Sequence, residues 1–340
     1  MTDLDILYPH PGSKGWAPVT ALAKLAADQL GGELVELNGA EWKTSMFKAR
    51  ALLPRVKGGG RRALLIAPYP AHLQNILELE VIAKRYDEIS AWVFDSFWTD
   101  RVPMVARRGR RFDHLYVTNP EDIEPWSKLV SWNVDCLPWG SDVFGNYPVN
   151  NRKMVDLLRV GRQPYSWDDD KSTLEVAARF NVKFEGRPPF GHDDDSSHDL
   201  LRRRMNESKL VLAFSNSVDR AYYTHQEREY LTGRWTDALA SGCLVVGRLP
   251  KCEATKMLLR DASTYEISSN LTLGIKQVRE IVHDWKPEVA QENQMLALKF
   301  LDWRHRLAVI AKDLHIDPPK LKADLCAIDG YLRGARRSSY

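Results

Sequence analysis

Residues 229–246, EYLTGRWTDALASGCLVV, decide the fold. The first part predicts a helix, because Trp235, Ala238 and Leu239 recur at helical spacing and form one apolar face. Gly242 ends that helix, and the apolar run CLVV that follows it is typical of a buried strand. A helix that passes at once into a buried strand is the repeating unit of a parallel α/β sheet.

The same alternation extends outward in both directions. Strands are predicted at 4–8, 34–37, 63–67, 91–94, 115–117, 130–134, 155–160, 182–184, 210–214, 243–246 and 264–266. Helical patterns occur at 18–30, 171–179, 200–208, 235–241 and 255–259, and residues 287–330 are mostly helical. The sequence therefore predicts an α/β fold with two Rossmann-like, doubly wound domains facing a crevice.

A segment rich in Gly, Pro and Asn near the middle of the chain, residues 138–152 (PWGSDVFGNYPVNNR), is predicted to link the two domains. The boundary is placed between residues 150 and 151. A chain of 340 residues suits two domains, since domains usually contain ~100–200 residues.

The composition excludes several classes of protein. A hydrophobic fraction of 44% and a charged fraction of 27% indicate a globular chain and not a disordered one. The four cysteines lack CxxC spacing, which favours reduced thiols, and the amino terminus lacks a signal peptide, so we expect a cytoplasmic protein. With a net charge of +3 and no nucleic-acid-binding motif, we do not expect nucleic acid as a partner.

Because ligands of open α/β sheets bind beyond the carboxyl ends of the strands, the loops after strands hold the candidate residues. Gly12 and Gly15 would let the backbone approach a ligand closely, or they serve only a turn. Arg162 and Lys171 would cradle a diphosphate, or they form surface ion pairs with the acids at 168–170. The chain lacks the GxGxxG fingerprint of a nicotinamide site.

Acidic residues form a second group of candidates. Asp237 lies in the first turns of its helix and could accept sugar hydroxyls, or it complements the helix dipole. The acidic runs at 168–170 and 192–195 could chelate a divalent cation, but solvated acids or helix caps are the preferred interpretation. We therefore predict no metal site and no cofactor.

The amino half carries two further candidates. His72 and Asp95 both follow predicted strands. Asp95 and His72 are the first candidates for a general base, since a hydroxyl nucleophile needs its proton removed. A structural hydrogen bond is the alternative role for either.

The segment at 229–246 resembles the donor-binding signature of group 1 GT-B glycosyltransferases. In that signature a glutamate is followed by seven residues, a second acid, Ala-Leu-Ala-x-Gly and a hydrophobic strand, as in Glu229, Asp237 and the residues after them. Three further segments resemble family elements in the same order: 136–144 (CLPWGSDVF), 160–162 (VGR) with Lys171, and 209–217 (KLVLAFSNS). Arg234 resembles the arginine of a CgeB-like branch.

The resemblance implies a role for each matching residue. Arg162 and Lys171 would hold the diphosphate of a nucleotide sugar, and Arg234 would contact phosphate. Asp237 would contact the ribose and Glu229 the transferred sugar, so that Glu229 joins Asp95 and His72 among the catalytic candidates. Two features depart from the pattern: the second acid is Asp, and the usual Gly-Phe-Gly after the first glutamate is missing.

The resemblance also implies an architecture and an activity. Residues 1–150, with a carboxyl-terminal tail at 316–340 that returns to them, would form the acceptor-binding domain, and 151–315 the donor-binding domain. The activity would be metal-independent, retaining transfer of a sugar to a hydroxyl of a glycan, glycolipid or small molecule. A nucleotide-sugar epimerase and a degenerate, non-catalytic nucleotide-sugar-binding protein are the alternatives, and turnover distinguishes them.

Two basic clusters, at 107–111 (RRGRR) and 333–337 (RGARR), would suit peripheral contact with the inner membrane surface and a lipid-linked acceptor. A solvated charged face is the alternative interpretation of each cluster.

Overall fold

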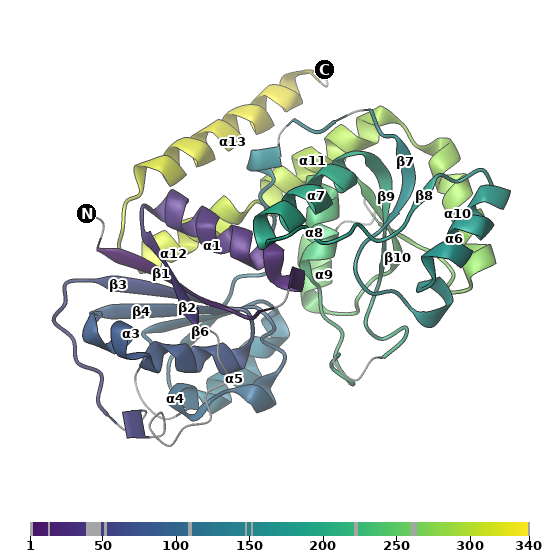
Figure 1. Cartoon of the computed structure of the whole chain (residues 1–340). Helices are drawn as coiled ribbons and strands as arrows, with labels where there is room; N and C mark the ends of the chain where they lie inside the picture. Colours follow the sequence, from purple (N-terminus) through teal and green to yellow (C-terminus); the bar gives the residue numbers. More distant parts are fainter. Residues whose placement is uncertain are drawn as a thin grey trace. The chain divides into compact units, whose positions relative to one another are not determined.

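The computed structural model describes residues 3–12, 14–38, 49–50, 53–107, 111–146, 148–150, 152–220, 224–259 and 264–338. The chain forms two compact units (Figure 1). Unit 1 comprises Met1–Pro138 and Arg306–Leu325, and unit 2 comprises Trp139–His305 and Cys326–Tyr340. Within the described part of the chain, no helix combines the length and hydropathy that crossing a bilayer requires.

Unit 1 contains a six-stranded parallel sheet of order β2-β1-β3-β4-β5-β6. Its strands are β1 (Leu4–His10), β2 (Glu33–Asn38), β3 (Arg62–Ala67), β4 (Glu88–Val93), β5 (His114–Val117) and β6 (Asn133–Cys136). The connections are η1 (Lys14–Trp16), α1 (Ala17–Leu30), η2 (Pro70–Leu77), α3 (Leu79–Ala83), η3 (Thr99–Arg101), α4 (Met104–Arg107), η4 (Pro120–Asp122) and α5 (Ile123–Leu129).

The strand order of unit 1 reverses at β1. From β1 the chain moves outward to β2, and from β3 it moves the other way to β6. Because parallel crossovers are right-handed, this reversal places α1 on one face of the sheet and α4 and α5 on the other (Figure 1).

Unit 2 contains a five-stranded parallel sheet of order β11-β10-β9-β7-β8. Its strands are β7 (Val155–Arg159), β8 (Phe184–Glu185), β9 (Ser208–Phe214), β10 (Leu244–Arg248) and β11 (Thr264–Glu266). Its helices are η5 (Phe144–Asn146), η6 (Tyr165–Trp167), α6 (Asp170–Arg179), α7 (Asp194–Asn206), α8 (Gly233–Ala240), α9 (Glu253–Leu258), α10 (Leu271–Asp284) and α11 (Pro287–Phe300). Helix α8 packs against α7 and α11, and α6 packs against α10.

Two further helices, α12 (Trp303–Asp313) and α13 (Pro319–Ser338), complete the chain. The part that belongs to unit 1, Arg306–Leu325, is held there by polar contacts. The hydroxyl of Tyr116 donates to Asp313 over 2.6 Å, and Gln29 donates to Asp324 over 2.9 Å. The sequence assigned the tail from residue 316 onward to the amino domain, whereas Cys326–Tyr340 belongs to unit 2.

The segment predicted as a linker is mostly packed into unit 2. The backbone N–H of Val149 donates to the side-chain oxygen of Gln294 over 2.7 Å, and that of Ser141 donates to the carbonyl of Leu301 over 2.9 Å. The division between the units therefore falls after Pro138, ahead of the predicted position between residues 150 and 151.

Some helices and strands begin or end at other residues than predicted, because local interactions at their ends set the boundary. The helix predicted from residue 200 starts at Asp194, because the Asp193 and Ser196 side chains form a reciprocal capping box there. Helix α10 was not predicted; Asn270 caps its amino end by accepting from the N–H of Leu273. The strand predicted at 130–134 lies at 133–136, because Val130 terminates α5.

Asp5 on β1 is fully buried, and its contacts make the stability of unit 1 depend on pH. Its carboxylate accepts hydrogen bonds from Arg61 and from Tyr86, and from Lys84 over 2.7 Å. Burial acts to raise its pKa, but these three donors outweigh burial and hold the pKa of Asp5 below its ordinary value. The stabilisation is therefore present near neutral pH and is lost as the pH falls through that lowered pKa.

Asp5→Asn is expected to lower the free energy of unfolding by ~2–3 kcal/mol at pH 7, because two cations lose their carboxylate. The measurement is urea unfolding of both proteins at pH 7 and at pH 3. The difference in the free energy of unfolding between the two proteins should shrink at pH 3. An equal difference at both pH values would contradict a negative charge on Asp5.

Candidate functional site

Each sheet has a point at which the order of successive strands reverses, so that the chain adds strands first on one side and then on the other. In unit 2 it lies between β7 and β9, because β7 leads outward to β8 and the chain then returns to β9 on the other side. In unit 1 it lies between β1 and β3. Loops that follow the two strands at such a point diverge, and ligands of open α/β sheets bind there.

In unit 2 the loop after β7 brings two of the predicted donor-binding arginines together. Gly161 has a φ of 68°, a conformation that favours glycine, and Arg162 follows it. Arg234, in the first turn of α8, donates to the main-chain oxygen of Arg162 over 2.8 Å. A Cβ at Gly161 would lie 3.8 Å from the Arg234 guanidinium, so this side chain lies close to the backbone of the loop.

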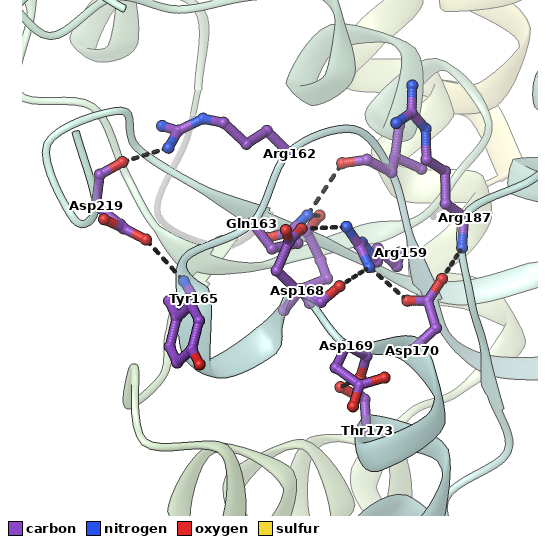
Figure 2. Close-up of polar contacts among 12 residues, drawn as sticks. Arg159, Arg162, Gln163, Tyr165, Asp168, Asp169, Asp170, Thr173, Arg187 and Asp219 are labelled. Carbon is purple, nitrogen blue, oxygen red and sulfur yellow. Dashed lines mark hydrogen bonds and ion pairs between the residues drawn. The ribbon is translucent and has the colours of Figure 1, made fainter. Parts of the chain in front are cut away.

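Asp219, in the loop after β9, holds the loop after β7 from the other side (Figure 2). The Arg162 guanidinium donates to the main-chain oxygen of Asp219. The Asp219 carboxylate accepts from the backbone N–H of Tyr165 over 2.8 Å. The two loops at the reversal point of unit 2 are thus bound directly to each other.

The acidic run at 168–170 has a structural explanation (Figure 2). Arg159, at the end of β7, donates to Asp168 and, over 2.7 Å, to Asp170. Asp169 caps α6 by accepting from the N–H of Lys171 over 3.0 Å. These acids therefore neutralise Arg159 and begin a helix. Among the described residues, no group of three or more His, Cys, Asp or Glu side chains is placed to hold a metal ion.

Lys171 lies in the first turn of α6 with its side chain exposed. Within the described ranges, no contact joins it to Arg162 or Arg234. The structure thus brings together two of the three cations that were predicted to hold phosphate. The role of Lys171 stays a prediction.

Glu229 lies between the carboxyl ends of β9 and β10. Its carboxylate accepts from the hydroxyl of Ser215 over 2.5 Å and from the backbone N–H of Lys251 over 3.1 Å. Burial acts to raise the pKa of Glu229, but these hydrogen bonds, with the nearby charge of Arg248, hold the pKa below its ordinary value. Glu229 is therefore a carboxylate at neutral pH, suited to accept hydrogen bonds from hydroxyls.

Asp237, on α8, is held by a different part of unit 2. Its carboxylate accepts from the hydroxyl of Ser141 over 2.7 Å and lines a cavity of about 10 Å³ with His198 and Arg202. Burial, aided by the charge of Asp142, raises the pKa of Asp237 to about 7 against the effect of the Ser141 hydrogen bond. The cavity has room for about one water molecule, and contact with a ribose stays a prediction.

In unit 1 the reversal point gathers histidines and glycines. Gly12 follows β1 with a φ of 73°, and its N–H donates to the Nδ1 atom of His10 over 3.0 Å. Gly15 lies in the exposed turn η1. His72, in η2 after β3, is buried against the ring of Tyr69 at a centroid distance of 3.8 Å.

His72 is uncharged at neutral pH. Burial, with the charge of His10, lowers the pKa of His72 to about 4. Neither ring nitrogen of His72 has a hydrogen-bond partner within the described ranges. A neutral imidazole can accept a proton, but only 3% of His72 is exposed, which limits its access to a substrate.

Asp95 follows β4, the strand next to β3 in the sheet. Its backbone N–H donates to the carbonyl of Pro68 over 3.0 Å, which ties the loop after β4 to the loop after β3. Burial raises the pKa of Asp95 to about 7, although the charge of Arg101 acts to lower it. A carboxyl group whose pKa lies near neutral pH is well matched to general-base catalysis.

Several residues that organise the unit 2 loops were not among the predicted site residues: Arg159, Ser215, Asp219, Arg248 and Lys251. All of them lie at or just after the carboxyl end of a predicted strand. This position after a strand is the sequence feature that could have identified them as candidates. Their partners could not be inferred, because each partner lies on a different crossover of the sheet.

No protein-family model matches the sequence, and a search of curated proteins gave no match. Solved structures with a similar fold include two that match along nearly the whole chain. The first is an α-glucosyltransferase in complex with UDP-glucose and DNA containing an abasic site; it shares 10% identity at a TM-score of 0.53, over 91% of this chain and 99% of that one. The second is Anabaena Alr3699/HepE in complex with UDP, with 11% identity, a TM-score of 0.50, and coverage of 93% and 100%.

The fold is of the GT-B type. The predicted α/β architecture with two parallel sheets is thereby confirmed. At 10–11% identity the similarity shows the GT-B fold alone. The assignment to a CgeB-like branch stays a prediction.

Proposed function

We propose that this chain is a glycosyltransferase that moves a sugar from a nucleotide-diphosphate sugar to a hydroxyl acceptor. Unit 2 would bind the donor, and unit 1 would supply the acceptor-side groups. The observation that carries the proposal is the Arg234 guanidinium held against the backbone of Gly161 and Arg162, at the reversal point of a GT-B fold.

The chemistry explains why two arginines are suitable there. As the bond from the sugar to the diphosphate breaks, negative charge develops on the departing phosphate oxygens. Arginine donates paired hydrogen bonds to such oxygens and carries a permanent charge. The amino terminus of α8, which carries Arg234, adds a favourable partial positive charge. These groups can stabilise the leaving diphosphate without a metal ion.

A uridine nucleotide is the first donor to test, because both similar structures were solved with UDP or UDP-glucose. The ionised Glu229 would accept hydrogen bonds from hydroxyls of the transferred sugar.

For the acceptor, we propose Asp95 as the base that removes the hydroxyl proton. A base suits inversion at the sugar, whereas the sequence resemblance implies retention. The NMR coupling constant of the product's anomeric proton decides between them.

The acceptor class is proposed as a glycan or lipid-linked hydroxyl. One of the two similar structures contains DNA, which is in tension with the expectation that nucleic acid is not a partner. Acceptor screening should therefore include DNA. Conversion of the donor sugar without any acceptor would favour the epimerase alternative, and donor binding without turnover would favour the degenerate binding protein.

Arg234→Ala is expected to weaken donor binding by about tenfold or more, because a charge-assisted contact to phosphate is lost. The measurement is a thermal-shift titration with UDP-glucose, and with GDP-, ADP-, dTDP- and CMP-sugars, each with and without EDTA. Arg279→Ala, on an exposed position of α10, is the matched control and should bind like the wild type. If no nucleotide sugar stabilises the wild-type chain, the proposed function is wrong.

A further inference from the structure

Unit 1 contains a cavity of about 280 Å³ at the amino ends of its strands. Ile89, the second residue of β4, and Arg111, just before β5, both line it. The candidate catalytic residues His72 and Asp95 follow the carboxyl ends of β3 and β4. Since the strands are parallel, the cavity lies at the opposite end of the sheet from those residues.

The wall of the cavity is mainly apolar. Ile76 of η2, Val81 and Ile82 of α3, and Ile89 of β4 supply aliphatic side chains. The cavity reaches the surface beside Leu53, which is 58% exposed. An opening of this kind admits an alkyl chain from solvent, and the volume approaches that of ordinary small-ligand pockets.

Among the residues that the structure describes, Arg111 is a buried cation without an acidic partner. It is only 7% exposed, lines the cavity, and donates to the main-chain oxygen of Arg50 over 2.8 Å and to that of Leu53. Burial, with the charge of Arg55, lowers the pKa of Arg111. The charge of Arg55 is itself balanced by Asp113 at 2.6 Å. A buried charge without a counter-charge is costly, so an anion beside Arg111 would be stabilising.

Arg85 adds a second cation to the lining. Its side chain is exposed, and no hydrogen bond or ion pair joins it to another side chain in the described part of unit 1. None of the described residues that line the cavity is acidic. The cavity therefore combines an apolar interior with two cations that no carboxylate of the described residues neutralises.

We propose that this cavity binds an anionic amphiphile, with the alkyl chain against Ile76, Val81 and Ile82 and a phosphate or carboxylate at Arg85 and Arg111. The site is independent of the glycosyltransferase proposal, because neither His72 nor Asp95 lines it. The ligand has two sources: a single-chain molecule in solution, or a lipid of a membrane surface. Of the basic cluster at 107–111, Arg111 thus faces this cavity, and residues 108–110 lie outside the described ranges.

The test is calorimetric titration of the full chain with dodecyl phosphate below the concentration at which it forms micelles. We expect saturable one-to-one binding. Butyl phosphate, which lacks the long chain, and dodecyltrimethylammonium, which carries the opposite charge, should each bind at least about tenfold more weakly. Arg85→Glu and Ile82→Trp, which fills the cavity, should each weaken dodecyl phosphate binding to a similar extent. Arg279→Glu, on α10 of unit 2, should leave it unchanged.

Equal binding of the three compounds, or binding unaffected by both Arg85→Glu and Ile82→Trp, would overturn the proposal. Co-sedimentation with phosphatidylcholine vesicles, with and without phosphatidic acid, distinguishes the sources. Binding to the phosphatidic acid vesicles that Arg85→Glu removes supports the site and assigns a membrane lipid. Dodecyl phosphate binding without vesicle binding supports the site and assigns a soluble ligand. Vesicle binding without dodecyl phosphate binding would also overturn the proposal.

Discussion

Asp95→Asn is expected to lower kcat by about 100-fold or more, because an asparagine cannot accept the proton of the acceptor hydroxyl. Burial raises the pKa of Asp95 to about 7, so the wild-type kcat should rise as the pH passes through about 7. The variant should lose that rise. The measurement is kcat against pH for both proteins, with the donor identified by the thermal-shift screen. A variant with near wild-type kcat would exclude Asp95 as the base.

The stability of the same variant provides a control for folding. The pKa of Asp95 is raised from 3.8 to about 7, so the folded state favours the protonated form and loses stability as the pH rises between these values. Asp95→Asn removes this loss and should be roughly 1–3 kcal/mol more stable than the wild type at pH 8. Urea unfolding at pH 8 and pH 4 tests this, since the gain should disappear at pH 4. Lower activity together with higher stability would separate a catalytic loss from misfolding.

Gly247→Ala is expected to lower the free energy of unfolding by more than ~4 kcal/mol. Gly247 lies within β10 at a φ of 151°, and a Cβ there would lie 1.9 Å from the main-chain oxygen of Ala213 on β9. Backbone on a paired strand cannot move away without breaking the pairing of β9 with β10. Because these strands also carry Ser215 and Lys251 toward Glu229, any folded fraction should bind donor weakly.

Urea unfolding and circular dichroism measure this effect, and a neutral Gly247→Ala would show that the backbone of β10 differs from the one described. Gly330→Ala is the matched control. Gly330 lies on α13, and a Cβ there would meet nothing within 4 Å. Alanine favours a helix interior over glycine by about 1 kcal/mol, so this variant should be as stable as the wild type or slightly more stable.

The strands of both sheets could be predicted from the sequence because their signal is local. The runs that form β1, β3, β7, β9 and β10 are almost continuously apolar, as buried parallel strands require. The signal was weaker where a side chain outside the strand or helix set the boundary. Asp193 and Asn270, for example, begin helices through hydrogen bonds that depend on a few atoms.

The sequence could likewise predict where candidate site residues lie relative to the strands, but not their surroundings in the folded unit. The family resemblance selected Glu229, which hydrogen bonds place between the carboxyl ends of β9 and β10. The rule that ligands bind after strand ends selected Arg162 and Asp95, and the structure places both of them at carboxyl ends of strands. The same rule gave equal weight to His72, which is almost fully buried, and to Lys171, which no described contact joins to the arginines. The burial of a side chain and its contacts with other side chains depend on how the whole unit packs. The position of a residue in the sequence therefore cannot show which candidates can reach a ligand.

The sequence by itself determined the α/β class, the order of the strands and the set of polar residues at the strand ends, because hydrophobic periodicity and turn residues act over a few neighbouring positions. Only the tertiary structure decided which charges meet. The Arg234 side chain donates to the main-chain oxygen of Arg162, 72 residues earlier, and Arg159 pairs with Asp168 and Asp170. Arg111 is buried without a carboxylate partner in the described part of the chain. Such pairings depend on which crossover packs on which face of a sheet, and this is fixed only when the whole unit folds.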